Sequence, residues 1–417
     1  MRIGLIGAGN IGVNAHIPAV QANDGMAIVA AADPTPDRLA LAGEAAGLVP
    51  EQLHADWRDL LACDEVDAVI VATPQRFRPE IVIAAAQAGK HILAEKPLAL
   101  TPAAAQAMID AAREHGLTLA TVHNYHFMPV YRDIKDVLDS GEIGEPEVAV
   151  LNYLGVEDRP GTAAFNPRWR HRAAESGGGV LMDMLHVVYL AHWLMGGPPR
   201  AVSAWIDKRL ETDGDVEDIA LVRYTYPHGQ ALVNMAWGTG PGGIDIGGTR
   251  GRITMDNQNA GTHPFVPVER LNVVSESGTR SWTPMDAAAY GMAGIARDFC
   301  DAAQEGREPM ANGEMGLAAL DAVLGAYVSG ALSEEVALPL PVDHPVYTKG
   351  SAGIGDLALP ESSPVVRRGL FGTAGALGSL RGTRKEVPPA GAGPETATNE
   401  RRLSRSHTHK HGGNHGV

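Results

Sequence analysis

Cysteine, basic residues and long apolar runs are scarce in this 417-residue sequence. The 2 cysteines, Cys63 and Cys300, provide neither a disulfide framework nor a thiol cluster for structural zinc, which suits the reducing cytoplasm. The formal net charge of −15 argues against a nucleic-acid partner, because binding phosphates needs a basic surface. The N-terminal MRIGLIGAGNIG lacks the apolar stretch of a signal peptide, and no run reaches the ~18 apolar residues of a membrane span. We therefore expect a cytoplasmic protein that binds small molecules and no membrane.

The first part of the chain alternates short apolar runs with Ala-rich helical stretches. This pattern predicts a parallel sheet covered by helices. The expected strands are residues 3–6, 27–32, 68–72, 91–94 and 118–122. We expect a helix over 79–88 that ends at Gly89, and another that begins at Thr101 with Pro102 in its first turn. With 45% hydrophobic residues in 417, two domains are expected, the first over residues 1–122.

The pattern changes after residue 122. A helix is expected over 129–140, and strand-like runs follow without helices between most of them, which predicts a predominantly antiparallel sheet. These runs are residues 147–153, 201–206, 219–226 and 230–237. Further helices are expected from the glycine run 177–179 to Gly196, near 291–303 and over 313–332. The predicted fold class is therefore α/β, with a second α/β domain over residues 123–345.

Residues 350–417 are rich in Gly, Pro, Ala, Ser and Arg. Such a composition buries too little apolar surface to offset chain entropy, so we expect a disordered C-terminal tail. Its histidines would form at best a loose metal site, and no metal ion is expected to have a biological role there. They are His407, His409, His411 and His415.

The first predicted strand runs directly into Gly7, Gly9 and Gly12, a GxGxxG pattern that also contains Asn10 and Ile11. The first glycine permits a tight turn, the second lets the backbone approach a pyrophosphate, and the third lets the helix pack on the strand. The pattern predicts a dinucleotide site, although a glycine-rich turn without a ligand would look the same.

Asp33 ends the second predicted strand, 21 residues after Gly12, close to the ~20-residue spacing at which a carboxylate binds the adenosine ribose. This carboxylate favours NAD, because it would repel the 2′-phosphate of NADP. Arg38 is near enough to soften that preference, so NADP stays open. The alternative is that Asp33 is only a turn residue before Pro34.

The stretch VATPQRFRPEIVIAAAQAGKHILAEKPLALT resembles the glucose-fructose oxidoreductase, inositol dehydrogenase and rhizopine-catabolism group, Gfo/Idh/MocA. Its most specific part is AGKH-x-L-x-EKP-x-A-x-T, and the likeness covers about residues 1–345. The resemblance implies a Rossmann domain, a second domain with an open antiparallel sheet and a nicotinamide cofactor. It also implies a sugar or cyclitol substrate and a homodimer or homotetramer built on the open sheet faces.

The same resemblance makes Lys96 of EKP the catalytic lysine, with Thr73, Pro74 and Glu95 beside the nicotinamide. A cation next to a substrate hydroxyl stabilises a developing alkoxide and lowers the pKa of a neighbouring histidine. The alternative for Lys96 is a surface ion pair with Glu95. Gln75 stands where the family usually has asparagine and can still donate a hydrogen bond to the cofactor.

Asp183 and His186 in GGGVLMDMLHVVYL are three residues apart, so we expect them on one face of one helix. His186 is the candidate general base, and Asp183 would orient or polarise the site. In the family the histidine usually stands four residues after this aspartate. Tyr189 stands where a second aspartate is common. The proton relay therefore departs from the family pattern, and core packing is the alternative for His186.

The stretch FNPRWRHR lies where the family builds its substrate pocket, and it contributes Arg168, Trp169 and Arg170. Arginines bind carboxylates bidentately and a tryptophan offers an apolar face to a sugar ring, so an anionic sugar is one hypothesis. Pairing of these arginines with Asp158 or Glu175 is the alternative.

Other polar and aromatic residues are candidates for the same pocket. Asn124 is expected at both cofactor and substrate, while Tyr153 and Trp237 either line the pocket or pack in the core. Arg78, where the family commonly has histidine, either joins the site or is solvated.

The residues and the resemblance together predict an NAD(P)-dependent oxidoreductase that interconverts a secondary alcohol and a ketone on a sugar, sugar acid or cyclitol. Two alternatives remain. A redox-neutral glycosidase or lyase would use transient oxidation and a second base, for which His171, His186 and Tyr189 are candidates. A dinucleotide-binding sensor would need no proton relay, and the joint presence of Lys96, Asp183 and His186 argues against it.

Overall fold

The computed structural model of the chain describes residues 1–156, 168–209, 214–237, 242–256, 270–285 and 288–373. The predictions on Asp158 and on the histidines of the C-terminal end fall outside these ranges.

The N-terminal region is a six-stranded parallel sheet in the order β3-β2-β1-β4-β5-β6. Its strands are short runs of Val, Ile, Leu and Ala that are buried on both faces, as a helix-covered parallel sheet requires. They are β1 (Arg2–Ile6), β2 (Ala27–Ala32), β3 (Leu53–His54), β4 (Ala68–Val71), β5 (His91–Ala94) and β6 (Leu119–Thr121). This is the doubly wound order in which the connections reverse direction beside β1, and ligands bind at the carboxyl ends of the strands there.

Helices cover both faces of this sheet. The expected N-cap is present, since the Thr101 side chain accepts a hydrogen bond from the Ala104 amide. The connecting helices are η1 (Gly12–His16), α1 (Ile17–Gln21), α2 (Pro36–Ala46), η2 (Pro50–Gln52), α3 (Trp57–Leu61), α4 (Arg78–Gln87) and α5 (Pro102–Glu114). A later helix, α10 (Ala288–Glu305), also packs here, because Phe299 and Cys300 share a core with Leu5.

The second sheet has nine strands in the order β14-β13-β12-β11-β7-β10-β9-β8-β15. All neighbours are antiparallel except β7 and β10, which run parallel. The strands are β7 (Pro146–Val156), β8 (Ala201–Asp207), β9 (Ile219–Tyr226), β10 (Gly229–Trp237), β11 (Gly242–Gly248), β12 (Gly251–Asp256), β13 (Arg270–Ser275), β14 (Gly278–Trp282) and β15 (Val336–Ala337). The predominantly antiparallel second sheet is confirmed.

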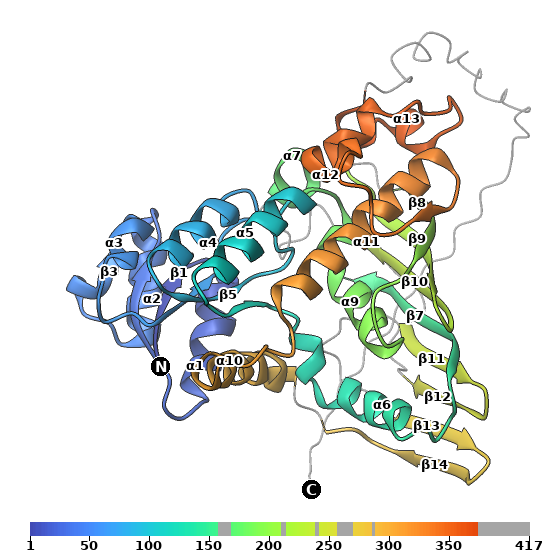
Figure 1. Cartoon of the computed structure of the whole chain (residues 1–417), viewed down its shortest axis with the longest axis horizontal. Coiled ribbons are helices and arrows are strands. Elements are labelled where there is room, and N and C mark those ends of the chain that lie inside the picture. Colours follow the sequence, from blue (N-terminus) through green and yellow to red (C-terminus); the bar gives the residue numbers. More distant parts are fainter. Residues whose placement is uncertain (157–167, 210–213, 238–241, 257–269, 286–287, 374–417) are drawn as a thin grey trace, which may run out of the picture. The chain divides into compact units, whose positions relative to one another are not determined.

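One face of the second sheet packs against helices, among them α9 (Leu185–Leu194) and α11 (Gly313–Leu332) (Figure 1). Preceding or flanking them are η3 (Asn124–Phe127), α6 (Pro129–Asp139), η4 (Arg168–His171), α7 (Ala173–Ser176) and α8 (Val180–Asp183). By length and composition α11 alone among the described helices could span a membrane, with a mean hydropathy of 1.5, but 78% of its apolar window is buried inside the protein. We therefore describe it as a core helix.

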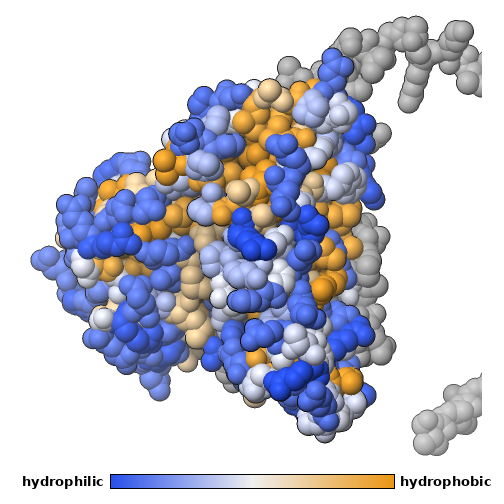
Figure 2. Space-filling model, turned by 45° about the vertical axis from the view of Figure 1, so that its right-hand side comes forward, coloured by the Kyte–Doolittle hydropathy of each residue, from blue (hydrophilic) through white to orange (hydrophobic). Residues whose placement is uncertain are grey.

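The other face of this sheet exposes apolar side chains at alternating positions. Val148, Trp205, Leu221 and Leu232 are 37–49% exposed, whereas on each strand the residue that follows points into the core. These following residues are Ala149, Ile206, Val222 and Val233. Hydrophobic residues also reach the surface in the view of Figure 2, where they gather in the upper half of the molecule between hydrophilic ones.

The prediction that disorder begins at residue 350 is wrong for residues 350–373. This segment continues α12 (Pro345–Lys349) with η5 (Gly350–Asp356), α13 (Pro364–Arg368) and η6 (Leu370–Gly372). Ile354, Val365 and Leu370 are completely buried, and Phe371 packs on Tyr327 with ring centroids 4.7 Å apart. The prediction overlooked these apolar residues because it considered the average composition of the whole segment 350–417. Residues 374–417 lie outside the described ranges.

Candidate active site

A cavity of ≈ 1810 Å³ lies at the carboxyl ends of β1, β2, β4 and β5 and extends to residues of η4, α8 and α9. Sites for one small molecule commonly measure ~300–1,000 Å³, so this cavity has room for a dinucleotide and a second ligand. Most of the sequence-predicted site residues line it. They are Gly7, Gly9, Asn10, Ile11, Asp33, Arg38, Thr73, Pro74, Gln75, Glu95, Lys96, Asn124, Trp169, Arg170, Asp183 and His186.

The three glycines of the turn differ in what surrounds them. Gly7 has φ +100°, and a Cβ there would lie 2.8 Å from the Ala72 backbone. A Cβ at Gly12 would lie 2.3 Å from the carbonyl oxygen of Gly7, so this glycine permits the helix to start against the strand. A Cβ at Gly9 would meet no protein atom within 4 Å and would enter the cavity. The backbone at Gly9 is thus open to a ligand that approaches closely, as a pyrophosphate does.

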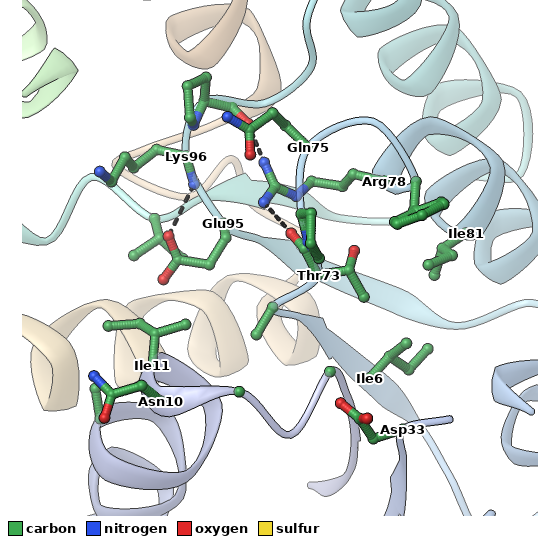
Figure 3. Close-up of a pocket in the computed structure, with 18 of the residues that line it drawn as sticks. Ile6, Asn10, Ile11, Asp33, Thr73, Gln75, Arg78, Ile81, Glu95 and Lys96 are labelled. Atoms are coloured by element: carbon green, nitrogen blue, oxygen red, sulfur yellow. Dashed lines mark hydrogen bonds between the residues drawn. The ribbon is translucent and has the colours of Figure 1, made fainter. Parts of the chain in front are cut away.

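Asp33 joins the turn after β1 to the turn after β2. Its carboxylate accepts hydrogen bonds from the amides of Ala8 and Thr35, each at 2.9 Å, and only 6% of the residue is exposed. The same carboxylate lines the cavity together with Arg38. Figure 3 shows Asp33 on the far side of the glycine turn from Asn10 and Ile11.

The loop after β4 is tied to the loop after β5 by Arg78. The residue is 2% exposed, and its guanidinium donates to the carbonyl oxygen of Thr73 at 2.5 Å and to that of Pro97 (Figure 3). The interpretation of Arg78 as a solvated side chain is therefore wrong. Gln75, on the same loop, donates to the carbonyl oxygen of Ser176 at 3.0 Å and lines the cavity.

Glu95 and Lys96 follow β5. The Glu95 carboxylate lies 3.0 Å from the ring Nε2 of buried His16 and accepts from the Lys96 amide at 3.0 Å. Burial would raise the pKa of Glu95, but the His16 hydrogen bond and the charges of His16, Lys96 and Arg78 lower it below its usual value. A surface ion pair does not describe Lys96, because its Nζ donates to the main-chain carbonyl of Asp183 at 2.7 Å.

Asp183 and His186 lie on two helices rather than one, which corrects the prediction. Met184, with φ −93° and ψ 29°, interrupts the chain between α8 and α9. The Asp183 carboxylate is 3.6 Å from the Arg170 guanidinium, so this arginine pairs with Asp183 rather than with Glu175, whose partner is Arg76. Both Asp183 and His186 nevertheless line the cavity.

Buried Glu217 holds the start of α8 in place. Its carboxylate accepts from the amides of Gly179 at 2.8 Å and Leu181 at 2.9 Å and from the Tyr327 hydroxyl at 2.9 Å. A Cβ at Gly179 would lie 1.8 Å from the Glu217 carbonyl oxygen, which accounts for a glycine at this position. Glu217 thereby fixes the helix turn that carries Asp183.

His186 is held from behind by aromatic residues. Its Nδ1 is 2.8 Å from the Tyr189 hydroxyl, and its ring stacks on Tyr125 with centroids 4.6 Å apart. Burial lowers the pKa of His186 well below 6.5, and the charges of Lys96, His123 and Arg170 lower it further. Burial also lowers the pKa of Lys96, which the carboxylates of Asp183 and Glu95 oppose. The site therefore pairs an imidazole that resists protonation with the amino group of a lysine in one cavity.

Two predicted pocket residues, both aromatic, do not line the cavity. Tyr153 is buried and its hydroxyl pairs with that of Tyr131 at 2.6 Å, and Trp237 stacks on His171 with centroids 4.6 Å apart. Both belong to the core, which corrects the assignment of Tyr153 to the substrate pocket and favours core packing of the two alternatives for Trp237. Arg168 begins η4, and its side chain lies outside the described part of the structure.

Sequence reasoning missed His16 and Tyr125, and it considered Tyr189 only as a second base. His16 comes from the π-helical turn of η1, which no simple periodicity predicts. Tyr125 and Tyr189 are distant in sequence and meet only in the folded protein, where the Tyr125 amide donates to the Tyr189 hydroxyl. The glycine run, Asp183 and His186 were the only local signals of this part of the site.

A parallel sheet of this order, with a glycine turn after β1 and an acidic residue after β2, defines a dinucleotide-binding domain. The adjoining cavity carries an ammonium group, a carboxylate and an imidazole, the groups used in acid–base chemistry. Fold and site together define the class of dinucleotide-dependent enzymes.

Comparisons with known proteins identify the family. Residues 1–123 match the model of the oxidoreductase family with an NAD-binding Rossmann fold, and residues 131–254 match the GFO/IDH/MocA C-terminal domain. The chain belongs to this family of NAD-dependent oxidoreductases. The resemblance, the fold class and the cofactor expected from the sequence are confirmed.

Relatives and solved structures show the same relationship. The chain is 30% identical to 1,5-anhydro-D-fructose reductase of Ensifer adhaerens, over 80% of this chain and 98% of that one. It is 30% identical to myo-inositol 2-dehydrogenase of Thermotoga maritima, over 62% of this chain and 75% of that one. The WlbA dehydrogenase from Bordetella pertussis, solved with NADH and UDP-GlcNAcA, superposes with a TM-score of 0.68 and 26% identity, covering 82% and 99% of the two chains.

Proposed function

We propose that this protein interconverts a secondary alcohol and a ketone on a sugar, sugar acid or cyclitol. The observation that carries the proposal is the convergence of Lys96, Asp183 and His186 on one cavity that also contains the glycine turn. Bound NAD would supply the hydride acceptor or donor. Gly7, Gly9, Asn10, Ile11 and Asp33 would hold its adenosine and pyrophosphate part, and Thr73, Pro74 and Glu95 would surround its nicotinamide.

Lys96 and His186 divide the acid–base work in this proposal. The ammonium group of Lys96 has three protons, of which one is donated to the Asp183 carbonyl, so two remain for a substrate oxygen. Its positive charge would stabilise negative charge on that oxygen as the hydroxyl proton leaves. Neutral His186 would accept the proton. Asp183 would hold Arg170, and the side chain of Trp169 would lie against the sugar ring.

Asp33 and Arg38 bear on the choice between NAD and NADP. The Asp33 carboxylate is fixed by two backbone amides beside the cavity and would oppose a 2′-phosphate. Arg38 lines the same end of the cavity and would tolerate one. We therefore propose NAD as the preferred cofactor, with NADP accepted more weakly.

The redox-neutral alternative needs a second base next to the transient ketone. Of the three residues considered for it, only His186 lines the cavity, while His171 stacks on Trp237 and Tyr189 lies behind the His186 ring. This arrangement favours simple oxidation and reduction over elimination.

We further propose a cytoplasmic homodimer or homotetramer. The apolar side chains exposed on the open face of the second sheet, such as Trp205 and Leu221, would be covered by a second copy of the chain. Size-exclusion chromatography with light scattering tests this, and a monomer at micromolar concentration would contradict it.

The substrate panel decides the function. The purified full chain is mixed with NAD⁺ or NADP⁺ and with myo-inositol, levoglucosan, D-apiose, D-glucuronate or D-galacturonate, and NADH formation is followed by absorbance. The reverse reaction is followed with 1,5-anhydro-D-fructose and NADH or NADPH. The proposal expects turnover of at least one compound, faster with NAD(H). Cofactor binding by calorimetry without redox turnover of any compound would instead favour elimination or a sensor.

A further inference from the structure

The hydroxyl of Tyr189 has three hydrogen-bond partners directly behind the cavity. It is 3.0 Å from the backbone amide nitrogen of Tyr125, 3.2 Å from the Oδ1 of Asn124 and 2.8 Å from the Nδ1 of His186. Tyr189 itself is buried and does not line the cavity, whereas Asn124 and His186 do. The hydroxyl therefore cannot touch a substrate, but it contacts a group that can.

Counting protons determines the direction of each bond. A phenol hydroxyl donates one hydrogen bond and accepts two. The Tyr125 amide can only donate, and the Asn124 Oδ1 can only accept. The single hydroxyl proton therefore goes to Asn124, and the remaining partner, His186 Nδ1, must carry a proton and donate it to the Tyr189 oxygen. In the opposite arrangement the hydroxyl proton would point at His186, and lone pairs of the Tyr189 and Asn124 oxygens would face each other 3.2 Å apart in a buried site, without a hydrogen bond between them.

We propose that Tyr189 is a positioning residue that keeps His186 in the Nδ1-protonated tautomer, with Nε2 unprotonated toward the cavity. The inference deepens the proposed function and rests on it, because Nε2 is then the atom that accepts the substrate proton. Within the described residues Nε2 makes no hydrogen bond, so its lone pair is available.

Ring stacking fixes the plane in which this lone pair lies. His186 stacks on Tyr125 with an interplanar angle of 15°, and Tyr189 stacks on His123 with centroids 3.9 Å apart and an angle of 13°. Within that plane the imidazole could still be turned over about its Cβ–Cγ bond. The hydrogen bond to Tyr189 excludes this second orientation. Stacking and hydrogen bond together leave one orientation.

The arrangement also accounts for the spacing of three residues, instead of four, between Asp183 and His186. Because the chain breaks at Met184, the Asp183 carboxylate turns to Arg170 and no longer shares a helix with His186. Tyr189 is three residues after His186 on α9 and so lies on the same helix face. It takes over the orienting contact to Nδ1 from within that helix.

The direct test is the protonation of the His186 ring in the intact protein. Long-range ¹H–¹⁵N correlation spectra of the ¹⁵N-histidine-labelled full chain, with and without NAD⁺, show which ring nitrogen carries the proton. The chain has 16 histidines, so His186 is assigned from the signals that disappear in His186→Gln. The proposal expects an Nδ1-protonated neutral ring. An Nε2-protonated or cationic ring in the wild-type protein would overturn it.

Two tyrosine variants test the cause. Tyr189→Phe keeps the ring that stacks on His123 and removes only the hydroxyl, so we expect mixed tautomers at His186. Turnover of the best panel substrate should then show kcat lowered about 10- to 100-fold with KM changed little, which is part of the ~10²–10⁴-fold that a positioned acid–base group supplies. Tyr131→Phe removes another buried tyrosine hydroxyl, whose partner is Tyr153, and should leave the tautomer unchanged.

An Nδ1-protonated ring that persists unchanged in Tyr189→Phe would overturn the assigned cause, and an unfolded Tyr189→Phe would leave the wild-type spectrum as the deciding result. Failure of the proposed function is recognised separately. If His186→Gln retains full turnover, His186 is not the base, whereas the spectra still report whether Tyr189 sets its tautomer.

Discussion

The Nζ of Lys96 donates to the main-chain carbonyl of Asp183 at 2.7 Å, which joins the loop after β5 to the end of α8. The two halves of the site are therefore linked through a backbone atom, and the Asp183 side chain remains free to pair with Arg170. A lysine held in this way is oriented by a neutral acceptor and not by a direct ion pair with a carboxylate. The position of Lys96 consequently depends on the packing of α8 as well as on its own strand.

Gly9 and Gly12 should respond oppositely to alanine. A Cβ at Gly9 enters only the cavity, so Gly9→Ala should leave the unfolding free energy within ~0.5 kcal/mol and weaken NAD⁺ about tenfold or more. A Cβ at Gly12 meets the Gly7 carbonyl at 2.3 Å, so Gly12→Ala should destabilise the fold by about 1–3 kcal/mol. Denaturant unfolding and calorimetry with NAD⁺ measure the two effects. Equal loss of stability in both variants would refute this account of the turn.

Arg78 should matter far more than its neighbour Arg76. Arg78→Met leaves the carbonyl oxygens of Thr73 and Pro97 without their buried donor, at a cost of about 1–3 kcal/mol for each unpaired group. The two loops, which we propose to flank the nicotinamide, would then separate, and kcat/KM should fall about tenfold or more. Arg76→Met removes a surface ion pair with Glu175, worth ~0–1 kcal/mol, and an exposed cation–π contact with Phe77, worth ~0.5–1 kcal/mol, but no buried hydrogen bond. Matching losses of activity in the two variants would exclude the clamp.

Glu217 should make stability depend on pH. Burial raises its pKa from the ordinary 4.5 to about 7, against the hydrogen bonds from Leu181, Gly179 and Tyr327. The folded protein then holds a proton that the unfolded chain loses above pH ~4.5, so this contribution is complete below pH ~4.5 and is lost as the pH rises to about 7. Across that range the unfolding free energy of the wild type should fall by on the order of 3 kcal/mol relative to Glu217→Gln. A difference between the two proteins that is constant with pH would show that Glu217 does not titrate there.

Local sequence signals predicted much of the fold. Alternating runs located β1, β2, β4, β5 and β6, and the Thr101 cap located the start of α5. The strands β11 to β14 were missed, because glycine and polar residues interrupt their apolar pattern. The break at Met184 was missed as well, since residues 180–194 are apolar enough to read as one helix.

Of the site, only the residues that belong to sequence motifs could be predicted. The glycine turn, Asp33 and the EKP motif identify residues that stand directly after strands, so their position follows from the topology. Arg78 and His16 act through partners that are distant in sequence, and no local pattern indicates such partners. Tyr189 is close to His186 in sequence, but its contacts to Asn124 and Tyr125 form only in the folded protein. Tyr153 was assigned to the pocket and Trp237 was left open between pocket and core, because aromatic residues fit both equally well.

The most direct test of the account is the turnover of the Lys96→Ala protein. NADH formation from the best panel substrate is measured for the wild type, for Lys96→Ala and for Lys349→Ala, a surface lysine paired with Asp356. We predict that Lys96→Ala binds NAD⁺ within a few-fold of the wild type and loses about 10²–10³-fold in kcat, the usual cost of removing a charge-stabilising donor, while Lys349→Ala keeps full activity. Full turnover of Lys96→Ala would contradict the proposed chemistry.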